Sequence, residues 1–220
     1  MEFTPSAEER ILRAALQRFA VDGLSAPLRA VAQDAGVSAG LIIHHYGSRE
    51  HLLEVCDRRA LEVTHETKLE TFTGGSGVML AQLAEVERYA PVIGYVLRRL
   101  QAGGPLAQQL VTDFVRDAAD YLEQGVQAGL VSPSRDPEAR ARVLTEMALG
   151  ALLLQLPAQR DHLDLADLPT WIRSYTDALL LPMLELFTTP LLQDSTLLDA
   201  YRGAAASGEQ APTTTEGTTS

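Results

Sequence analysis

A glycine turn between two short helical segments is the sequence feature that most constrains the fold of this chain. The turn is Ala35-Gly36-Val37, and Ser38 follows it as a residue typical of a helix N-cap. We expect one helix over 25–34, with Pro27 in its first turn, and a second helix over 39–45. Two short helices joined by a tight glycine-containing turn have the geometry of a helix-turn-helix.

Helices are also expected on both sides of this pair. Ser6 and Glu9 have the spacing of a capping box, and the helix that they begin should end at Asp22-Gly23. On the other side, Ser48 is expected to cap a helix that begins at Arg49. The apolar residues of these helices recur at helical spacing and are predicted to form a small core: Ile11, Phe19, Val31 and Ile42.

The rest of the chain is predicted to be helical, so the fold class is all-α. Beyond the helix that starts at 49 and ends near 70, helices are expected over 78–89, 91–102, 105–129, 136–155, 168–188 and 191–202. We interpret 71–77 as a flexible loop, and expect Pro182 to kink or break its helix. This organisation predicts three regions: a helix-turn-helix domain over 1–50, a larger helical domain over 51–202 and a disordered tail over 203–220.

Composition bears on where the chain acts and on its partners. The first residues lack a basic region followed by an apolar run, and no apolar stretch approaches the ~20 residues of a membrane span, so a cytoplasmic protein without membrane contact is expected. The single cysteine, Cys56, fits a reducing compartment. The formal net charge is −11 overall, but the first fifty residues carry five basic and six acidic side chains. Because DNA binding requires a local cationic surface rather than a basic total, the acidity is only a weak objection to it.

The stretch from Arg10 to Leu53 resembles the N-terminal domain of the TetR family of transcriptional regulators. The matching residues are Arg10, Ile11, Ala14-Ala15, Phe19, Gly23, Arg29, Val31-Ala32, Ala35-Gly36-Val37-Ser38, His44-His45-Tyr46-Gly47-Ser48-Arg49-Glu50 and Leu52-Leu53. This string covers about a fifth of the chain, and the remainder is similar to the family in length and helical pattern. The resemblance implies a sequence-specific DNA-binding regulator, a repressor by the family's default, that places this domain in a major groove.

The residues predicted to contact DNA share small size, a hydroxyl group or a positive charge. They are Arg29, Ser38, Ala39, Gly40, Leu41, His44, Tyr46 and Arg49. Small residues allow close approach to the groove, Leu41 and Ala39 suit a thymine methyl group, and the polar side chains suit phosphates or base edges. Ile43 stands where the family commonly has tyrosine, and the chain has no asparagine to contact adenine, so apolar contacts and DNA shape should carry much of the specificity.

Two other readings stay open at this stage. An enzyme is disfavoured, because His65-Glu66 lacks the second histidine of a zinc protease motif and no phosphate loop or dinucleotide motif occurs. Neither a cofactor nor a metal site is predicted, although the histidines at 44, 45 and 51 are close in sequence. A helical bundle that has lost DNA binding is the second alternative, and retention of the basic and hydroxyl residues argues against it.

Family resemblance further implies a homodimer and a small-molecule effector. The last two long helices, over 136–155 and 168–188, are rich in leucine and are expected to pair with a second copy, which predicts a roughly palindromic operator. The resemblance places an effector pocket among the helices between 78 and 155. The candidate lining residues are Gln82, Tyr89, Tyr95, Arg99, Phe114, Tyr121, Met147 and Trp171.

Overall fold

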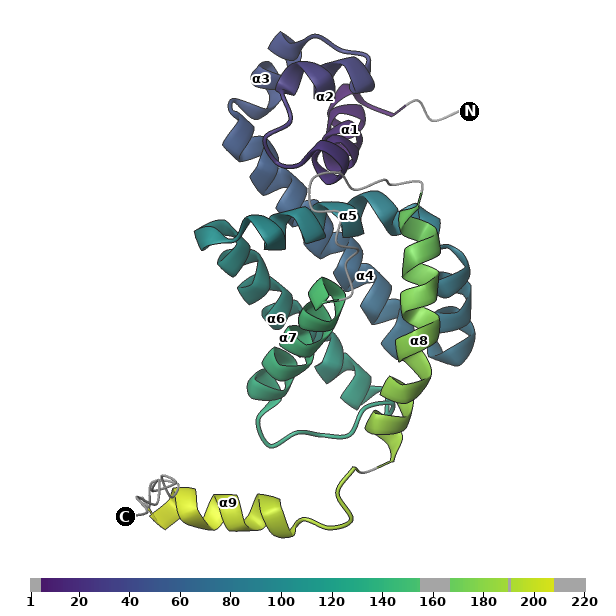
Figure 1. Ribbon diagram of the computed structural model, residues 1–220, viewed down its shortest axis with the longest axis vertical. Coiled ribbons are helices and arrows are strands. Elements are labelled where there is room, and N and C mark those ends of the chain that lie inside the picture. Colours follow the sequence, from purple (N-terminus) through teal and green to yellow (C-terminus); the bar gives the residue numbers. More distant parts are fainter. Residues whose placement is uncertain (1–4, 155–166, 190, 208–220) are drawn as a thin grey trace, which may run out of the picture. The chain divides into compact units, whose positions relative to one another are not determined.

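The computed structural model describes residues 5–154, 167–189 and 191–207, and within these ranges it contains nine α-helices and no strand (Figure 1). The helices are α1 (Ala7–Asp22), α2 (Leu28–Ala35), α3 (Ala39–Tyr46), α4 (Arg49–Ala84), α5 (Val86–Ala102), α6 (Gly104–Gln127), α7 (Pro137–Leu154), α8 (Leu168–Thr188) and α9 (Thr196–Ser207). The predicted all-α fold class is confirmed. No helix of the described part combines the length and the apolar character needed to span a membrane.

The chain forms two compact units, Met1–Tyr175 and Thr176–Ser220, and α8 belongs to both. The first unit contains α1 to α7 and the first turns of α8, where Leu168 and Ile172 pack with Ala90 and Leu97 of α5. In the second unit, the rest of α8 and α9 contain no buried side chain among the residues whose burial is described.

The helix caps predicted at Ser6, Ser38 and Ser48 are present, because each depends on side chains close in sequence. The predicted start of the second helix at residue 25 is wrong: α2 begins at Leu28, and Pro27 is its N-cap without a side-chain hydrogen bond. Ser6 and Glu9 form the capping box, with the Glu9 N–H donating to Ser6 Oγ at 3.1 Å. Ser38 Oγ accepts from the Leu41 N–H, and Ser48 Oγ accepts from the His51 N–H. Gly36 ends α2 with φ +65°, a left-handed conformation that side chains with a Cβ rarely adopt.

The N-terminal core is the one that the apolar spacing predicts. Ile11, Phe19, Val31 and Ile42 are all fully buried in one cluster that also contains residues of α4, α5 and α6. Burial of each such side chain stabilises the fold by about 1.5–3 kcal/mol. The helices α1 to α3 therefore share a continuous core with the larger helical region.

Two predictions for the middle of the chain are wrong. The boundary predicted near residue 90, between helices over 78–89 and 91–102, lies instead at Glu85, and α5 continues through Pro91. Residues 71–77 are helical within α4 rather than a loop. The Gln82 side chain nevertheless donates to the Thr67 carbonyl at 3.1 Å, although a straight helix would separate these residues by about 22 Å. The helical chain must therefore turn back on itself between Thr67 and Gln82, a segment that contains three glycines. The loop predicted over 71–77 therefore coincides with a reversal of the chain direction, which is helical rather than irregular.

Differences near the C-terminus are smaller. α8 is not broken at Pro182 and continues through Thr188. α9 continues through Ser207, beyond the predicted boundary at residue 202, so residues 203–207 are helical rather than disordered. The rest of the predicted tail, 208–220, lies outside the described residues.

Buried arginines of α5 connect the larger helical region to α1 and α4. Arg98 donates from Nε to the Ala20 carbonyl at 3.0 Å and from Nη2 to the Val21 carbonyl at 3.1 Å, so it satisfies two carbonyls of the last turn of α1. Arg99 donates from Nε to Asp57 of α4 at 3.0 Å. These contacts form a polar joint that connects α5 to α1 and α4.

Replacement of Arg98 by methionine is expected to lower the free energy of unfolding by about 2–3 kcal/mol, because two carbonyls lose charged hydrogen-bond donors while the apolar stem is kept. Urea denaturation followed by circular dichroism measures the change. Arg88→Met is the control, since its side chain is 74% exposed and should change stability little. Equal effects of the two substitutions would contradict a capping role for Arg98.

Candidate DNA-binding site

The helix-turn-helix is held together on its inner side. Ile42 and Tyr46 of α3 are buried, and the Tyr46 hydroxyl donates to the Glu8 carbonyl at 3.0 Å. Burial, with a smaller contribution from Glu8, raises the pKa of Tyr46 to about 12. The hydroxyl is therefore a fixed, neutral hydrogen-bond donor that connects α3 to α1, and it is not a free group on the exposed face of α3.

The outer face of α3 is small and apolar, with one imidazole. Ala39, Gly40, Ile43 and His44 are exposed, and their three- and four-residue spacing places them on one side of the helix. Leu41, predicted to contact a thymine methyl group, is only half-exposed. Ile43 is 45% exposed and was not among the predicted contacts, although it lies one turn after Ala39. That spacing was a signal that could have identified it.

The two motif arginines have different surroundings. Arg29 of α2 is exposed and has no hydrogen bond or ion pair with the described residues. Arg49 instead points inward: it donates to the Leu24 carbonyl at 2.6 Å and to the Ala26 carbonyl, and its guanidinium lies 5.6 Å from the centre of the Phe19 ring. Arg29 is thus an accessible cation, whereas Arg49 fixes the connection between α1 and α2.

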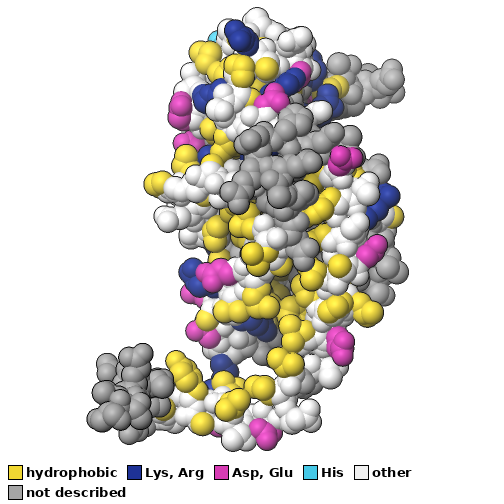
Figure 2. All heavy atoms as spheres, in the orientation of Figure 1, with side chains coloured by type: hydrophobic (Ala, Val, Ile, Leu, Met, Phe, Trp, Pro, Cys, Tyr) yellow, Lys and Arg dark blue, Asp and Glu magenta, His cyan; other side chains and the backbone are white. Residues whose placement is uncertain are grey.

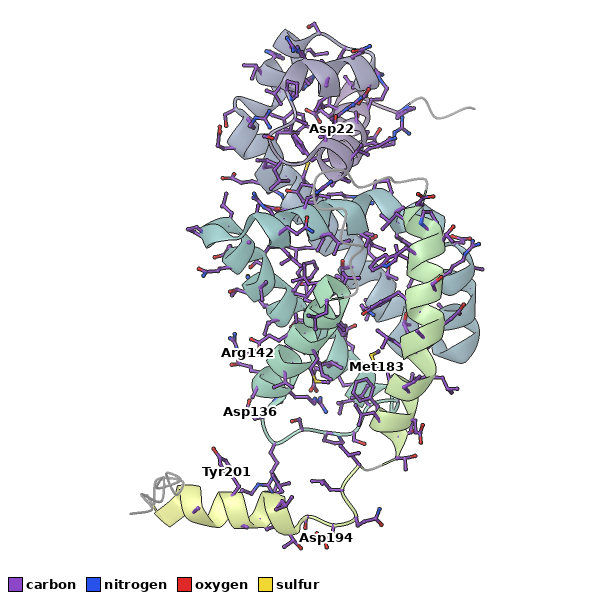
Figure 3. All side chains as sticks on the ribbon, viewed as in Figure 1. Asp22, Asp136, Arg142, Met183, Asp194 and Tyr201 are labelled. Atoms are coloured by element: carbon purple, nitrogen blue, oxygen red, sulfur yellow. The ribbon has the colours of Figure 1, made fainter. Side chains whose placement is uncertain are left out.

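Several other charged side chains in this region form contacts within the protein. Arg18 forms a paired contact with both Asp34 oxygens at 2.7 Å and also contacts Asp22, at the end of α1 (Figure 3). Arg10 donates to the Ala35 carbonyl at 3.1 Å, and the His45 ring lies 3.0 Å from a Glu8 carboxylate oxygen. These contacts stabilise the arrangement of α1, α2 and α3.

The remaining predicted contact, Ser38, is exposed while its hydroxyl caps α3. Its oxygen accepts from the Leu41 N–H, so the hydroxyl hydrogen remains able to donate outward. The structure thus gathers Ser38, Ala39, Gly40 and His44 on an accessible surface and directs Tyr46 and Arg49 into the domain.

The eight candidate effector-pocket residues lie in several surroundings. Tyr95 and Phe114 belong to the main core, and the Tyr95 hydroxyl is 2.6 Å from Asp57. Trp171 packs on the α5–α8 cluster, and Tyr121 packs on the separate α6–α7 cluster. The other four are Gln82, which bonds to Thr67 and Thr71; Tyr89, beneath Arg88; Arg99, paired with Asp57; and Met147, which is half-exposed.

The fold and the accessible face of α3 define a helix-turn-helix DNA-binding regulator, and comparisons with known proteins identify its family. Residues 11–56 match the model of bacterial regulatory proteins of the tetR family, and residues 87–193 match the tetracyclin repressor-like C-terminal domain. The chain is 41% identical over 205 residues to the HTH-type transcriptional regulatory protein RaaS of Mycobacterium tuberculosis, covering 93% of this chain and 95% of that protein. The chain belongs to the TetR family of transcriptional regulators, as its N-terminal residues predicted.

Solved structures share the fold at low sequence identity. A TetR-family regulator from Rhodococcus sp. is 20% identical with a TM-score of 0.56, over 78% of this chain and 97% of that one. FadR from Bacillus subtilis, solved in complex with stearoyl-CoA, is 17% identical with a TM-score of 0.52, over 83% and 98% of the two chains.

The contrast between Arg29 and Arg49 generates a testable difference. Arg49→Ala should lower the free energy of unfolding by about 1–3 kcal/mol, because the carbonyls of the α1–α2 connection lose a charged donor. Arg29→Ala should leave stability unchanged and weaken DNA binding with a smaller salt dependence, as loss of a phosphate contact requires. Thermal unfolding and operator titration at two salt concentrations measure both effects. Destabilisation by Arg29→Ala, with none by Arg49→Ala, would contradict this assignment.

Proposed function

We propose that this regulator is a cytoplasmic repressor that binds a palindromic operator as a homodimer and is released by a small-molecule effector. The observation that carries the proposal is the accessible face of α3, together with an exposed Arg29 on the preceding helix that has no hydrogen bond or ion pair with the described residues. A small apolar surface allows the helix to approach base edges, while an arginine on the preceding helix supplies attraction to phosphate. We retain Ser38, Ala39, Gly40, Leu41 and His44 as proposed contacts and add Ile43.

Exposed apolar side chains support the dimer. On α7, Val143 and Met147 are at least half exposed, and on α8 Leu181, Leu184 and Phe187 are exposed; Met183, also exposed, is marked in Figure 3. Hydrophobic side chains at the protein surface are visible in Figure 2. A large exposed apolar area is unfavourable in water, and a second copy would cover it.

An effector would act through the joint at α5. A ligand that binds one conformation of the larger region more tightly shifts the population towards that conformation. Because α5 is bonded to α1 and α4, such a shift would reach the DNA-binding helices. The fold neighbour FadR, described in complex with stearoyl-CoA, provides a precedent for a ligand in this fold.

Selection from a random-sequence duplex pool at two salt concentrations tests the proposal. We expect enrichment of a palindrome and an affinity that falls steeply as salt rises. Enrichment of an asymmetric site, or no enrichment even at low salt, would contradict a dimeric operator-binding repressor.

Two charge substitutions on α8 test the dimer. Leu184→Glu with Phe187→Glu should give a monomer and reduce operator affinity at least tenfold, because burial of two carboxylates in an apolar interface is unfavourable. Analytical ultracentrifugation and operator titration measure the effects. Leu106→Glu, at an exposed apolar position on α6, is the matched control and should remain dimeric. A dimeric α8 variant would exclude this part of α8 from the interface.

Replacement of individual thymines of the selected operator by uracil tests Ile43. Loss of one methyl contact should weaken binding by about 0.8 kcal/mol, or roughly fourfold. At the thymine that Ile43 contacts, the wild type should lose this affinity and Ile43→Ala should not. If every uracil substitution affects the two proteins equally, Ile43 does not read a methyl group.

A further inference from the structure

Two adjacent histidines of α3, His44 and His45, have different surroundings. The His45 ring lies towards α1, where its Nδ1 atom is 3.0 Å from a Glu8 carboxylate oxygen. The Glu8 carbonyl also accepts from the Tyr46 hydroxyl, so Glu8 holds two neighbouring residues of α3. His44 forms no hydrogen bond or ion pair with the described residues, and its ring packs edge-on against that of His45, with 5.6 Å between the ring centres. Of the two imidazoles, only that of His45 has a carboxylate partner in the described part of the chain.

His44 lies on the exposed face of α3, one turn after Gly40 and next to Ile43. A Cβ atom at Gly40 would meet only Ser38 Oγ, at 3.8 Å, so no side chain of another described helix lies against that turn. The His44 imidazole is therefore open to a molecule that approaches α3 from outside.

A positive charge on His44 would have no acidic partner within the described residues. The Glu8 carboxylate lies at His45, and the two exposed charges nearby without a contact of their own, Arg29 of α2 and Glu50 of α4, are opposite in sign. The other charged or titratable groups of α2 and of the first turns of α1 and α4, with Tyr46 of α3, have partners elsewhere: Glu9 with Ser6, Asp34 with Arg18, His51 with Glu54, Tyr46 with Glu8, and Arg10 and Arg49 with backbone carbonyls.

Imidazole is the side chain whose charge changes between about pH 5 and pH 8. The neutral ring donates one N–H, whereas the imidazolium ion donates two and carries a charge that attracts phosphate, which makes its hydrogen bond to phosphate the stronger one. A cation that neutralises a phosphate also releases counterions, so it makes binding more dependent on salt. Because phosphate favours the protonated ring, DNA affinity is highest at acidic pH and falls as pH rises through the titration of the imidazole.

We propose that His44 is a proton-dependent DNA contact, whose imidazolium form binds an operator phosphate, so that acidification tightens operator binding. This inference rests on the proposed operator-binding function and adds its regulation by pH. The adjacent His45 instead fixes α3 against α1 through Glu8.

Operator titration of the full-length protein at about pH 6 and pH 8, each at two salt concentrations, tests the proposal. The variants are His44→Gln, His44→Lys and His45→Gln. Glutamine keeps an N–H donor but carries no charge, and lysine is charged at both pH values. His45→Gln is the matched control, because it removes the imidazole one residue away that has the Glu8 partner. Circular dichroism at both pH values verifies that each variant is folded.

We expect the wild type to bind the operator at least about fivefold more tightly at the lower pH, with a salt slope of the logarithmic affinity that is steeper by about 0.9 per protomer. His44→Gln should lose both differences, and His44→Lys should have the steeper slope at both pH values. His45→Gln should keep the pH dependence of the slope, while loss of the Glu8 contact lowers its thermal stability. Wild-type pH and salt dependence in His44→Gln, or a pH dependence that disappears in His45→Gln but not in His44→Gln, would overturn the proposal.

The wild-type titrations separate this inference from the proposed function. Operator binding with the same affinity and salt slope at both pH values overturns the proton-dependent contact and leaves the repressor proposal standing. Absence of operator binding at both pH values overturns the proposed function, and this inference with it.

Discussion

The buried pairing of Arg99 with Asp57 is the interaction on which the connection between the two functional parts depends. The Arg99 side chain is 5% exposed and that of Asp57 is 16% exposed, so both charges are largely removed from water. Such a pair is stable only when its remaining hydrogen-bonding capacity is satisfied. Tyr95 provides this by donating to Asp57 at 2.6 Å, with its oxygen also 3.0 Å from the Leu53 carbonyl. Loss of one partner would leave the other charge buried and unpaired.

This joint gives the regulator a mechanical path between its parts. Arg98 and Arg99 are adjacent on α5, and they contact α1 and α4 respectively. α1 in turn holds α3 through the Tyr46 hydroxyl and the Glu8 carbonyl. A change in the position of α5 or α4 must therefore either move the recognition helix or break buried polar contacts. Allosteric coupling requires two arrangements of such a connected element, each favoured by a different ligand.

Local chemistry explains which features could be predicted from the sequence. The caps at Ser6, Ser38 and Ser48 use partners three residues away, so they could be predicted from the sequence. The core residues could also be predicted, because they follow helical periodicity. The family resemblance supplied the motif and its position. The inward orientation of the Arg49 side chain could not be predicted from the sequence, because its carbonyl partners lie more than twenty residues earlier in the chain.

Other features depend on packing between distant helices. The approach of His65 on α4 to Asp117 on α6 requires the two helices to lie side by side, and neither spacing nor composition indicates that register. Glycines at 74, 75 and 77 suggested a loop, but helical hydrogen bonding persists there while the chain reverses. Ile43 was not among the predicted contacts, because its replacement of the family's tyrosine was interpreted as the loss of a hydroxyl rather than as the gain of an exposed apolar side chain.

Amide hydrogen exchange of the Asp57→Asn variant tests most directly whether the α4–α5 joint couples the two parts. The substitution keeps the shape of the side chain and removes the charge that pairs with Arg99. We expect faster exchange on both sides of the joint, in α1 to α3 as well as in α5, because local opening of one side would release the other. Faster exchange confined to α5 and the adjoining turns of α4, with α1 to α3 unchanged, would contradict the coupling of the DNA-binding helices to the larger helical region.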